Sequence, residues 1–219
     1  MMIRIKKDDF YNYVAENYGS DVFIKFFDKI KYAKEFMDGQ ICMGTTQYYR
    51  DYYESDGRGD SAESTKTTTY IMGEIFESGG IRYHIDIPEL KGKEVYLTLC
   101  ATAMLLCLFS FGKDEQTKRN LSTLLNNKDS GLGRYACIVR NKSKFIKAIS
   151  TMTFLRCLDG FHGRPVIIQN RSYHGLVDYV DAPNDSCFQK KNDEKYITQQ
   201  EYRFAFSFDV DGYTSVKKG

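Results

Sequence analysis

The sequence predicts an α+β fold in which about four helices pack on a mixed, mainly antiparallel and curved sheet. Helical segments with apolar residues at three- and four-residue steps alternate with strand-like apolar runs. In the middle of the chain, short turn signals such as ESGG separate these runs, which is typical of antiparallel pairing. Three prolines in 219 residues, without repeats or a low-complexity linker, indicate a single globular domain over 1–219.

The first quarter of the chain is expected to alternate helices and strands. Side-chain caps and glycines set the helix ends, because the caps satisfy free backbone N–H groups and glycine accepts a left-handed backbone. In order, we expect a helix capped by Asp8 or Asp9 and ended by Gly19, a strand over 22–27, a helix capped by Asp28 and ended by Gly39, a strand over 40–43, and a short helix over 45–54.

The remainder of the chain is expected to supply most of the sheet. Alternating apolar and polar residues mark its strands, and leucines at helical spacing mark its first helix. In order, we expect a hairpin of 66–76 and 81–87, one long strand or two joined by a bend over 94–111, a helix opened by Asp114, a strand over 135–140, a helix capped by Ser143, and strands over 166–169, 176–180 and 202–208.

Composition excludes few classes of function. With 31 basic and 29 acidic residues the net charge is +2, which gives no general signal for nucleic acid. The longest apolar stretch, over 95–111, falls short of the roughly 20 residues that a membrane span requires. The first ten residues carry charges without an apolar segment behind them, so they do not resemble a secretion signal. We therefore expect a cytoplasmic protein with no membrane partner.

The six cysteines do not predict a metal site. They are never spaced as CxxC or CxH, whereas zinc needs clustered ligands, so no metal is expected. Cys42, Cys100, Cys107 and Cys137 lie in apolar runs and are predicted to be buried as small hydrophobes. All six thiols are predicted to be free. His174, in a loop-like segment, is interpreted as a surface or hydrogen-bonded residue.

Two segments near the ends of the chain carry the candidate site. Gln199 and Glu201 lie two apart at the mouth of an aromatic strand, and residues two apart on a strand share a face. Both could therefore point into one cleft. Alternatively, Glu201 is a strand-edge glutamate that pairs with a lysine or arginine across the sheet or with Arg203 on its own face. Such a pair contributes under about 1 kcal/mol if it is exposed. Strands 22–27 and 202–208 are predicted to lie close together in one sheet.

The order of segments resembles a widespread family of bacterial and phage proteins. The likeness rests on FIKFF, YAKEFMDGQICM and YYRDYYESDGRGDSAE at the start, LLCLFSF and GRYACIVRNKSKFIKAI in the middle, and QEYRF near the end, and it covers nearly the whole chain. This resemblance supplies no reaction that could be carried over.

A more remote resemblance is to the ADP-ribosyltransferase fold. That fold places a basic or imidazole residue on its first strand, a hydroxyl on its second and a glutamate at the start of a late strand. Lys25, Thr45 or Thr46, and Glu201 follow the same order here, although the first position is usually arginine or histidine. The resemblance implies that NAD is the cofactor or substrate, that Glu201 faces the positive charge developing on its ribose, and that Gln199 orients the attacking group.

Two further features have a binding interpretation beside a structural one. Tyr48 and Tyr49 could stack on a base or nicotinamide ring, or they could pack a core. Arg58, between glycines in GRGD, could approach a phosphate, or it could belong to a surface turn. Two hypotheses therefore stand: an NAD-using, ADP-ribosyltransferase-like or NAD-cleaving protein of bacterial and phage conflict, or a non-catalytic binding protein. The second class includes a phage-encoded, anti-CRISPR-like inhibitor of host defence and a defence-system component, each with a protein partner.

Overall fold

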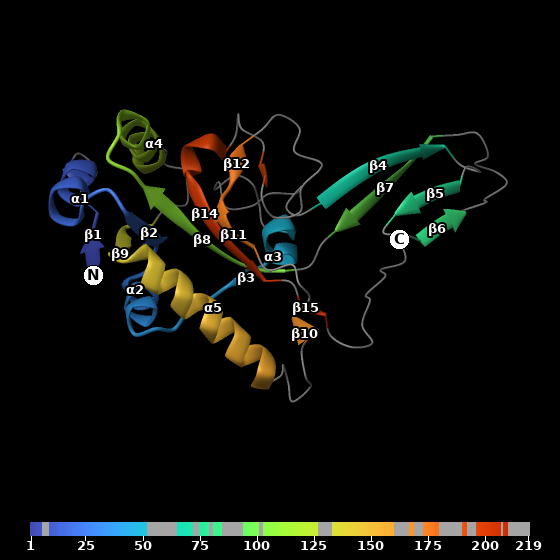
Figure 1. Ribbon diagram of the computed structural model, residues 1–219. Helices are drawn as coiled ribbons and strands as arrows, with labels where there is room; N and C mark the ends of the chain where they lie inside the picture. Colours follow the sequence, from blue (N-terminus) through green and yellow to red (C-terminus); the bar gives the residue numbers. More distant parts are fainter. Residues whose placement is uncertain are drawn as a thin grey trace.

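The fold class is α+β, as predicted, and its main sheet is antiparallel, curved and open (Figure 1). The computed structural model describes residues 1–5, 9–51, 65–71, 75–78, 81–84, 94–100, 103–126, 133–159, 167–168, 173–179, 190–191, 196–206 and 208–209. In spatial order the main sheet contains β1 (Met2–Arg4), β9 (Tyr135–Val139), β2 (Val22–Phe27), β8 (Met104–Phe111), β14 (Glu201–Phe206) and β11 (Tyr173–Leu176). A short strand, β3 (Gly44–Thr45), also pairs with β8.

The remaining described strands form two-stranded pairs. They are β4 (Thr65–Ile71) with β7 (Glu94–Cys100), β5 (Ile75–Ser78) with β6 (Ile81–His84), β10 (Ile167–Ile168) with β15 (Phe208–Asp209), and β12 (Asp178–Tyr179) with β13 (Lys190–Lys191). The predicted hairpin of 66–76 and 81–87 is confirmed only around ESGG, where β5 pairs with β6. The first part of its first strand is wrong, because β4 pairs with β7 and not with 81–87. The long apolar stretch forms two strands, β7 and β8, which was one of the two predicted alternatives.

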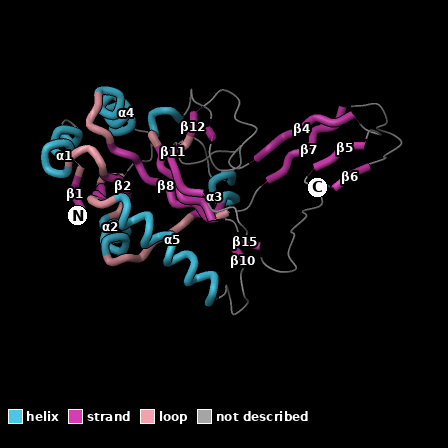
Figure 2. The backbone as a smooth tube through the Cα atoms, in the orientation of Figure 1, coloured by secondary structure: helices cyan, strands magenta, loops and turns pink. Residues whose placement is uncertain are grey.

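Helices cover both faces of the main sheet. They are α1 (Phe10–Tyr18), α2 (Ile30–Met37), α3 (Thr46–Asp51), α4 (Glu115–Asn126) and α5 (Lys142–Asp159), with a 3₁₀ turn η4 (Ile197–Gln199) before β14. In Figure 2, α1 and α4 lie on one side of the strands and α2 and α5 on the other. None of the described helices has both the length and the apolar character to cross a membrane.

Alternation along the central strands builds two hydrophobic clusters. Ile24 and Phe109 belong to the cluster that includes residues of α1 and α4. Phe23 and Leu108, one position away on the same strands, belong to the cluster that includes residues of α2 and α5. This follows from the two-residue period of a strand, because successive side chains point to opposite faces. Both faces of the stretches where β2 pairs with β8, 22–24 and 109–111, are therefore buried.

Strand β8 lies between the two strands that were predicted to share a sheet. It pairs with β2 from Val22 opposite Phe111 to Ile24 opposite Phe109. On its other side it pairs along its length with β14, from Glu201 opposite Phe109 to Phe206 opposite Met104. The prediction for 22–27 and 202–208 is thus confirmed for β2 and β14, whereas Phe208 lies in the separate strand β15.

Several predicted element ends are wrong. The N-cap of α2 is Lys29 and not Asp28, and Asn141 rather than Ser143 caps α5 by accepting a hydrogen bond from the backbone N–H of Lys144 at 2.8 Å. Residues 40–43 form no strand, because backbone pairing begins only at Gly44. The apolar pattern of this segment reflects burial instead, since Ile41 and Met43 pack against a hydrophobic cluster. By contrast, Asp114 opens α4 as predicted and accepts a hydrogen bond from the Thr117 backbone N–H at 2.8 Å.

The main sheet is split beside the middle of β8. Pairing with β2 ends at Ile24 opposite Phe109, and pairing with β3 covers only Leu105 and Met104. Within the described chain, no strand on this side pairs with the residues of β8 in between. Strand β2 continues against β9 alone as far as Phe27. A gap therefore opens between β2 and β3, with Cys107 of β8 at its centre.

Candidate functional site

A cavity of about 550 Å³ lies at this split. Its lining combines buried charged side chains from β14 and β13, aromatic rings from β2, α2 and α3, and apolar residues of β8. Among the residues that line it are Lys25, Phe27, Asp28, Tyr32, Glu35, Phe36, Cys42, Tyr48, Tyr49, Cys107, Lys191, Gln199, Glu201 and Arg203. Five of the predicted site residues, Lys25, Tyr48, Tyr49, Gln199 and Glu201, thus line one cavity.

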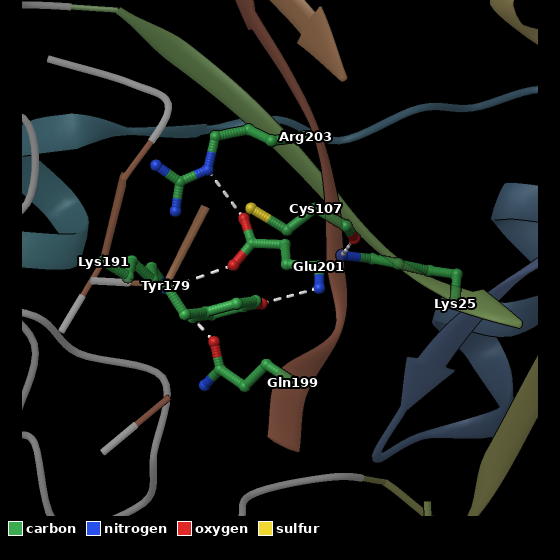
Figure 3. Close-up of polar contacts among 7 residues, drawn as sticks. All are labelled: Lys25, Cys107, Tyr179, Lys191, Gln199, Glu201 and Arg203. Atoms are coloured by element: carbon green, nitrogen blue, oxygen red, sulfur yellow. Dashed lines mark hydrogen bonds and ion pairs between the residues drawn. The ribbon is translucent and has the colours of Figure 1, made fainter. Parts of the chain in front are cut away.

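Three buried charged residues of the lining form an ion triad (Figure 3). Arg203 Nε donates to Glu201 Oε1 at 2.7 Å, and Lys191 Nζ lies 3.1 Å from Glu201 Oε2. Glu201 and Arg203 are 5% and 0% exposed, and Lys191 is 7% exposed. Each carboxylate oxygen therefore has its own cation. We call Lys191, Glu201 and Arg203 the ion triad.

Strand register places two members of the triad on the cavity side. Glu201 and Arg203 are two apart on β14 and share a face, opposite Phe109 and Cys107 of β8. Lys191 comes from β13, a separate short strand that pairs in parallel with β12. The ion pair between Glu201 and Arg203, which was the alternative interpretation of Glu201, is present. It is buried, and β14 lies between β8 and β11, so Glu201 is not at an exposed strand edge.

The electrostatic environment keeps Glu201 ionised. Burial by itself raises the pKa of the Glu201 carboxyl, but the charges of Arg203 and Lys191 outweigh burial and hold this pKa well below its usual range. Burial raises the pKa of the Cys107 thiol to about 12, and the nearby Glu201 carboxylate adds to that rise. Cys107 faces the cavity, so its side chain keeps partial exposure although protein surrounds it. At neutral pH the site thus contains a carboxylate and a protonated thiol.

Lys25 enters the site through the gap in the sheet. Its Nζ donates to the backbone carbonyl of Cys107 at 2.9 Å. That carbonyl lies on the stretch of β8 where pairing with β2 has ended, so the lysine satisfies a group that a strand would otherwise bond. In Figure 3, Lys25 and Lys191 reach toward the centre of the site from opposite sides. Lys25 therefore lines the cavity, as the candidate-site prediction required.

Tyr179 fixes the start of β14. Its hydroxyl accepts a hydrogen bond from the Glu201 backbone N–H at 2.7 Å, and the Val177 N–H donates to the Glu201 carbonyl at 2.9 Å. Burial raises the pKa of Tyr179, and the Glu201 carboxylate raises it further, so the phenol remains protonated. The backbone of Glu201 is thus held on the side away from β8 as well.

Gln199 reaches the cavity by a different route from the one predicted. It lies in η4 and not on the strand, and Gln200 follows in a left-handed conformation with φ 43° and ψ 49°. The period of a strand therefore does not relate Gln199 to Glu201. The Gln199 side chain nevertheless lines the cavity, and its Oε1 accepts a hydrogen bond from Lys191 Nζ at 3.1 Å.

Aromatic rings from β2, α2 and α3 also line the cavity. The rings of Tyr48 and Tyr49 lie 5.5 Å apart in a T-shaped arrangement, and Phe27 and Phe36 lie 5.4 Å apart. Tyr48 is 50% exposed, so part of its surface is open at the cavity. Tyr49 also packs against the small cluster of Ala103, Leu105 and Ala205, which supports its structural interpretation beside its binding one.

The structure does not place the two predicted threonines in the cavity lining. Thr45 Oγ1 accepts a hydrogen bond from the Tyr48 backbone N–H at 3.0 Å and so caps the start of α3. Thr46 is fully buried, and its hydroxyl accepts from the Ala103 backbone N–H at 3.2 Å. Arg58 lies outside the described residues.

Sequence reasoning missed Lys191, Tyr179 and Cys107 as cavity or site residues. Cys42 is exposed at the cavity, which contradicts its predicted burial, whereas Cys137 is buried as expected and Cys107 is partly buried. His174 is exposed and lies 3.0 Å from the Tyr202 hydroxyl, in agreement with its interpretation as a hydrogen-bonded surface residue. In the described ranges, no three His, Cys, Asp or Glu side chains gather as a metal ion would require.

Comparison with protein-family models, with curated proteins and with solved structures gave no match. The two resemblances noted in the sequence therefore stay predictions.

Proposed function

We propose that the cavity binds a nucleotide of the NAD class and that the protein cleaves it at the bond between ribose and nicotinamide. The single observation that carries this proposal is one cavity that unites buried cations, a buried carboxylate and a wall of aromatic rings. A dinucleotide presents matching groups, since its pyrophosphate is anionic, its bases are flat and its ribose carries hydroxyls. A cavity of about 550 Å³ is within the usual range for small-molecule sites.

The charged groups of the lining are of both signs. Three cations, Lys25, Lys191 and Arg203, line the cavity together with the carboxylates of Asp28, Glu35 and Glu201. Lysine and arginine side chains are the groups that bind phosphates, so the proposal places the pyrophosphate beside these three cations. Aromatic faces at Tyr48 and Tyr49 suit a base or nicotinamide ring.

In the proposed reaction the bond from the ribose C1′ to the nicotinamide nitrogen breaks, and nicotinamide leaves with the electron pair. Positive charge develops on the ribose, and the Glu201 carboxylate stabilises that charge and holds a ribose hydroxyl. Water then adds at C1′ and releases a proton, so NAD and water give ADP-ribose and nicotinamide. Gln199, beside Glu201 and Lys191, is the residue that would orient the attacking group. No role is assigned to Thr45 or Thr46.

The test is to incubate the purified protein with NAD and quantify nicotinamide and ADP-ribose, with ADP-ribose binding measured in parallel by calorimetry. Lys25→Met should weaken ADP-ribose binding because it removes a cation from the cavity. Lys142→Met is the matched control: Lys142 is also a partly buried lysine, bonded to Ser110 and Asp21, but it lies outside the cavity lining. Absence of both turnover and binding would overturn the proposal.

A second candidate is favoured by the pairing of Glu201 itself. Both carboxylate oxygens already accept contacts from cations, which is the arrangement of a structural ion pair. On this alternative the protein is a non-catalytic binding protein with a protein partner, and the triad holds the end of the sheet together. Binding of ADP-ribose without nicotinamide release would favour a nucleotide-binding role, and failure of both assays would leave the protein-partner role in the lead.

A further inference from the structure

Gln200, between the two candidate site residues, has a backbone conformation that is unusual for its type. Its φ of 43° and ψ of 49° are left-handed, and it is the single non-glycine residue with positive φ in the part of the chain that the structure describes. Side chains other than glycine, asparagine and aspartate rarely adopt this conformation, because Cβ approaches the carbonyl oxygen. Surrounding contacts must therefore hold it in place.

Those contacts come from α4. Gln200 Nε2 donates to Thr117 Oγ1 at 2.9 Å, and Asn120 Nδ2 donates to Gln200 Oε1 at 3.3 Å. Both partners are buried, with Thr117 0% and Asn120 6% exposed. On the backbone, the carbonyl of Gln200 accepts from the Ser110 N–H at 2.9 Å. We call Gln200, Thr117 and Asn120 the amide clamp.

The clamp is itself supported at the start of the helix. Thr117 Oγ1 donates to Asp114 Oδ2 at 2.8 Å, and the same Asp114 caps α4 through the Thr117 backbone N–H. Gln116 Nε2 donates to Asn120 Oδ1 at 2.8 Å. The side-chain amide of Gln200 therefore meets partners that are already oriented by the first turns of α4.

Gln200 turns away from the cavity while both of its neighbours line it. Its own side chain contacts α4, and Gln199 and Glu201 on either side belong to the cavity lining. Gln199 lies in η4 and not on β14, yet both neighbours contact one lysine, because Lys191 Nζ lies 3.1 Å from Gln199 Oε1 and 3.1 Å from Glu201 Oε2 (Figure 3). The left-handed residue thus lies at the junction of η4 and β14, between two side chains that contact the same lysine.

We propose that Gln200 is a positioning residue, and that the amide clamp sets Gln199 and Glu201 at the cavity so that ligand affinity depends on contacts made with α4. The choice of ligand in this inference rests on the proposed function. The effect of the amide clamp on the positions of Gln199 and Glu201 does not depend on that function. The rival explanation is that the clamp only fills a polar gap between α4 and the sheet. Such a role would affect stability and leave the ion triad where it is.

The test uses two clamp variants and one control. Gln200→Gly keeps the left-handed backbone accessible and removes the side-chain contacts, whereas Thr117→Val removes the acceptor on α4 without touching the strand. Ser122→Ala is the control, because Ser122 is an exposed α4 residue whose hydroxyl accepts a hydrogen bond from Asn126 within the same helix. Thermal melting establishes that each variant folds.

Two readouts separate positioning from packing. The first is the NMR resonance of the Arg203 Nε–H group, which bonds Glu201 Oε1 and is assigned with Arg203→Lys. We expect it to shift and to exchange faster with solvent in both clamp variants and to stay unchanged in the control. The second is the dissociation constant of ADP-ribose, which we expect to rise about tenfold or more in both clamp variants, since small displacements in a site have large effects.

The outcomes are distinct. A lower melting temperature with an unchanged Arg203 resonance and unchanged ADP-ribose affinity overturns the inference. A shifted resonance in a protein that binds no ADP-ribose supports the clamp and overturns the proposed ligand. If Thr117→Val fails to fold, Gln200→Gly alone decides, because its backbone conformation remains available.

Discussion

Replacing Glu201 by glutamine tests the ion triad most directly, because the substitution keeps the shape of the side chain and removes its charge. In the native protein Glu201 is 5% exposed and contacts Arg203 Nε at 2.7 Å and Lys191 Nζ at 3.1 Å. In Glu201→Gln, two buried cations lose their anion and one carboxylate oxygen becomes an N–H₂ donor that faces a donor. Breaking a buried ion pair by removal of one partner costs about 3–5 kcal/mol of stability.

The assay is urea or thermal unfolding followed by circular dichroism. For a chain of this size, about 1 kcal/mol corresponds to a shift of about 2–4 °C in Tm, so a fall of about 6–20 °C is expected. Glu35→Gln is the matched control. Glu35 pairs with Lys31 at 3.7 Å on the surface of α2, with side chains 34% and 75% exposed, and such pairs contribute about 0–1 kcal/mol.

A loss of less than about 1 kcal/mol in Glu201→Gln would refute the reasoning, since it would mean that solvent screens the pair as it screens an exposed one. The Tm of Glu201→Gln also sets the temperature at which its activity can be measured. Because the variant is destabilised, loss of NAD turnover in Glu201→Gln indicates a catalytic role only at a temperature well below its own Tm. Turnover must therefore be compared under conditions in which both proteins are folded.

The remaining predictions concern acid and thiol chemistry. The pKa of Glu201 is lower in the folded than in the unfolded protein, so the folded state binds fewer protons as the pH falls. The contribution of Glu201 to the free energy of unfolding is therefore lost progressively as the pH falls below about 4.3. The stability difference between the native protein and Glu201→Gln should narrow between about pH 5 and about pH 3, and a constant difference would contradict this. Denaturation without reductant should expose six free thiols. In the folded protein at pH near 8, iodoacetamide should modify the exposed thiol of Cys42 well before those of Cys107 and Cys137, because burial raises their pKa values to about 12 and about 11. Mass spectrometry of peptides gives the order of modification. An early adduct on Cys107 would contradict the prediction.

Elements with strong local signals could be predicted from the sequence. The strand over 22–27 combines β-branched and aromatic residues, and α4 begins at an aspartate that caps it as expected. The predicted strand over 40–43 failed because its apolar side chains are buried without strand pairing. A buried loop segment and a buried strand show the same alternation of apolar residues in the sequence. Only the position of a neighbouring strand, which the sequence of the segment does not contain, distinguishes them.

The cavity could be predicted only in part. In the segment EYRFAF, Glu201 and Arg203 occupy alternate positions of an otherwise apolar strand, and this pattern signals charges that face inward together. Lys191 gives no such signal, because a lysine in a polar segment has the local pattern of a solvated residue. Its burial follows from the pairing of β13 with β12, which brings a segment ten residues away in sequence next to Glu201.

The position of the triad bears on why the chain keeps three charges in its interior. Well-packed apolar side chains often replace a buried ion triad without loss of stability, so stability alone does not account for it. Here the triad does not lie in a closed core: it borders the gap where β2 leaves β8, and Lys25 enters that gap from the other side. Apolar replacements at the same three positions would remove three of the charged groups that line the cavity and leave Lys25, Asp28 and Glu35. On the proposed function, the triad is kept for its place in the cavity lining, and the test is whether its loss affects ADP-ribose binding more than stability.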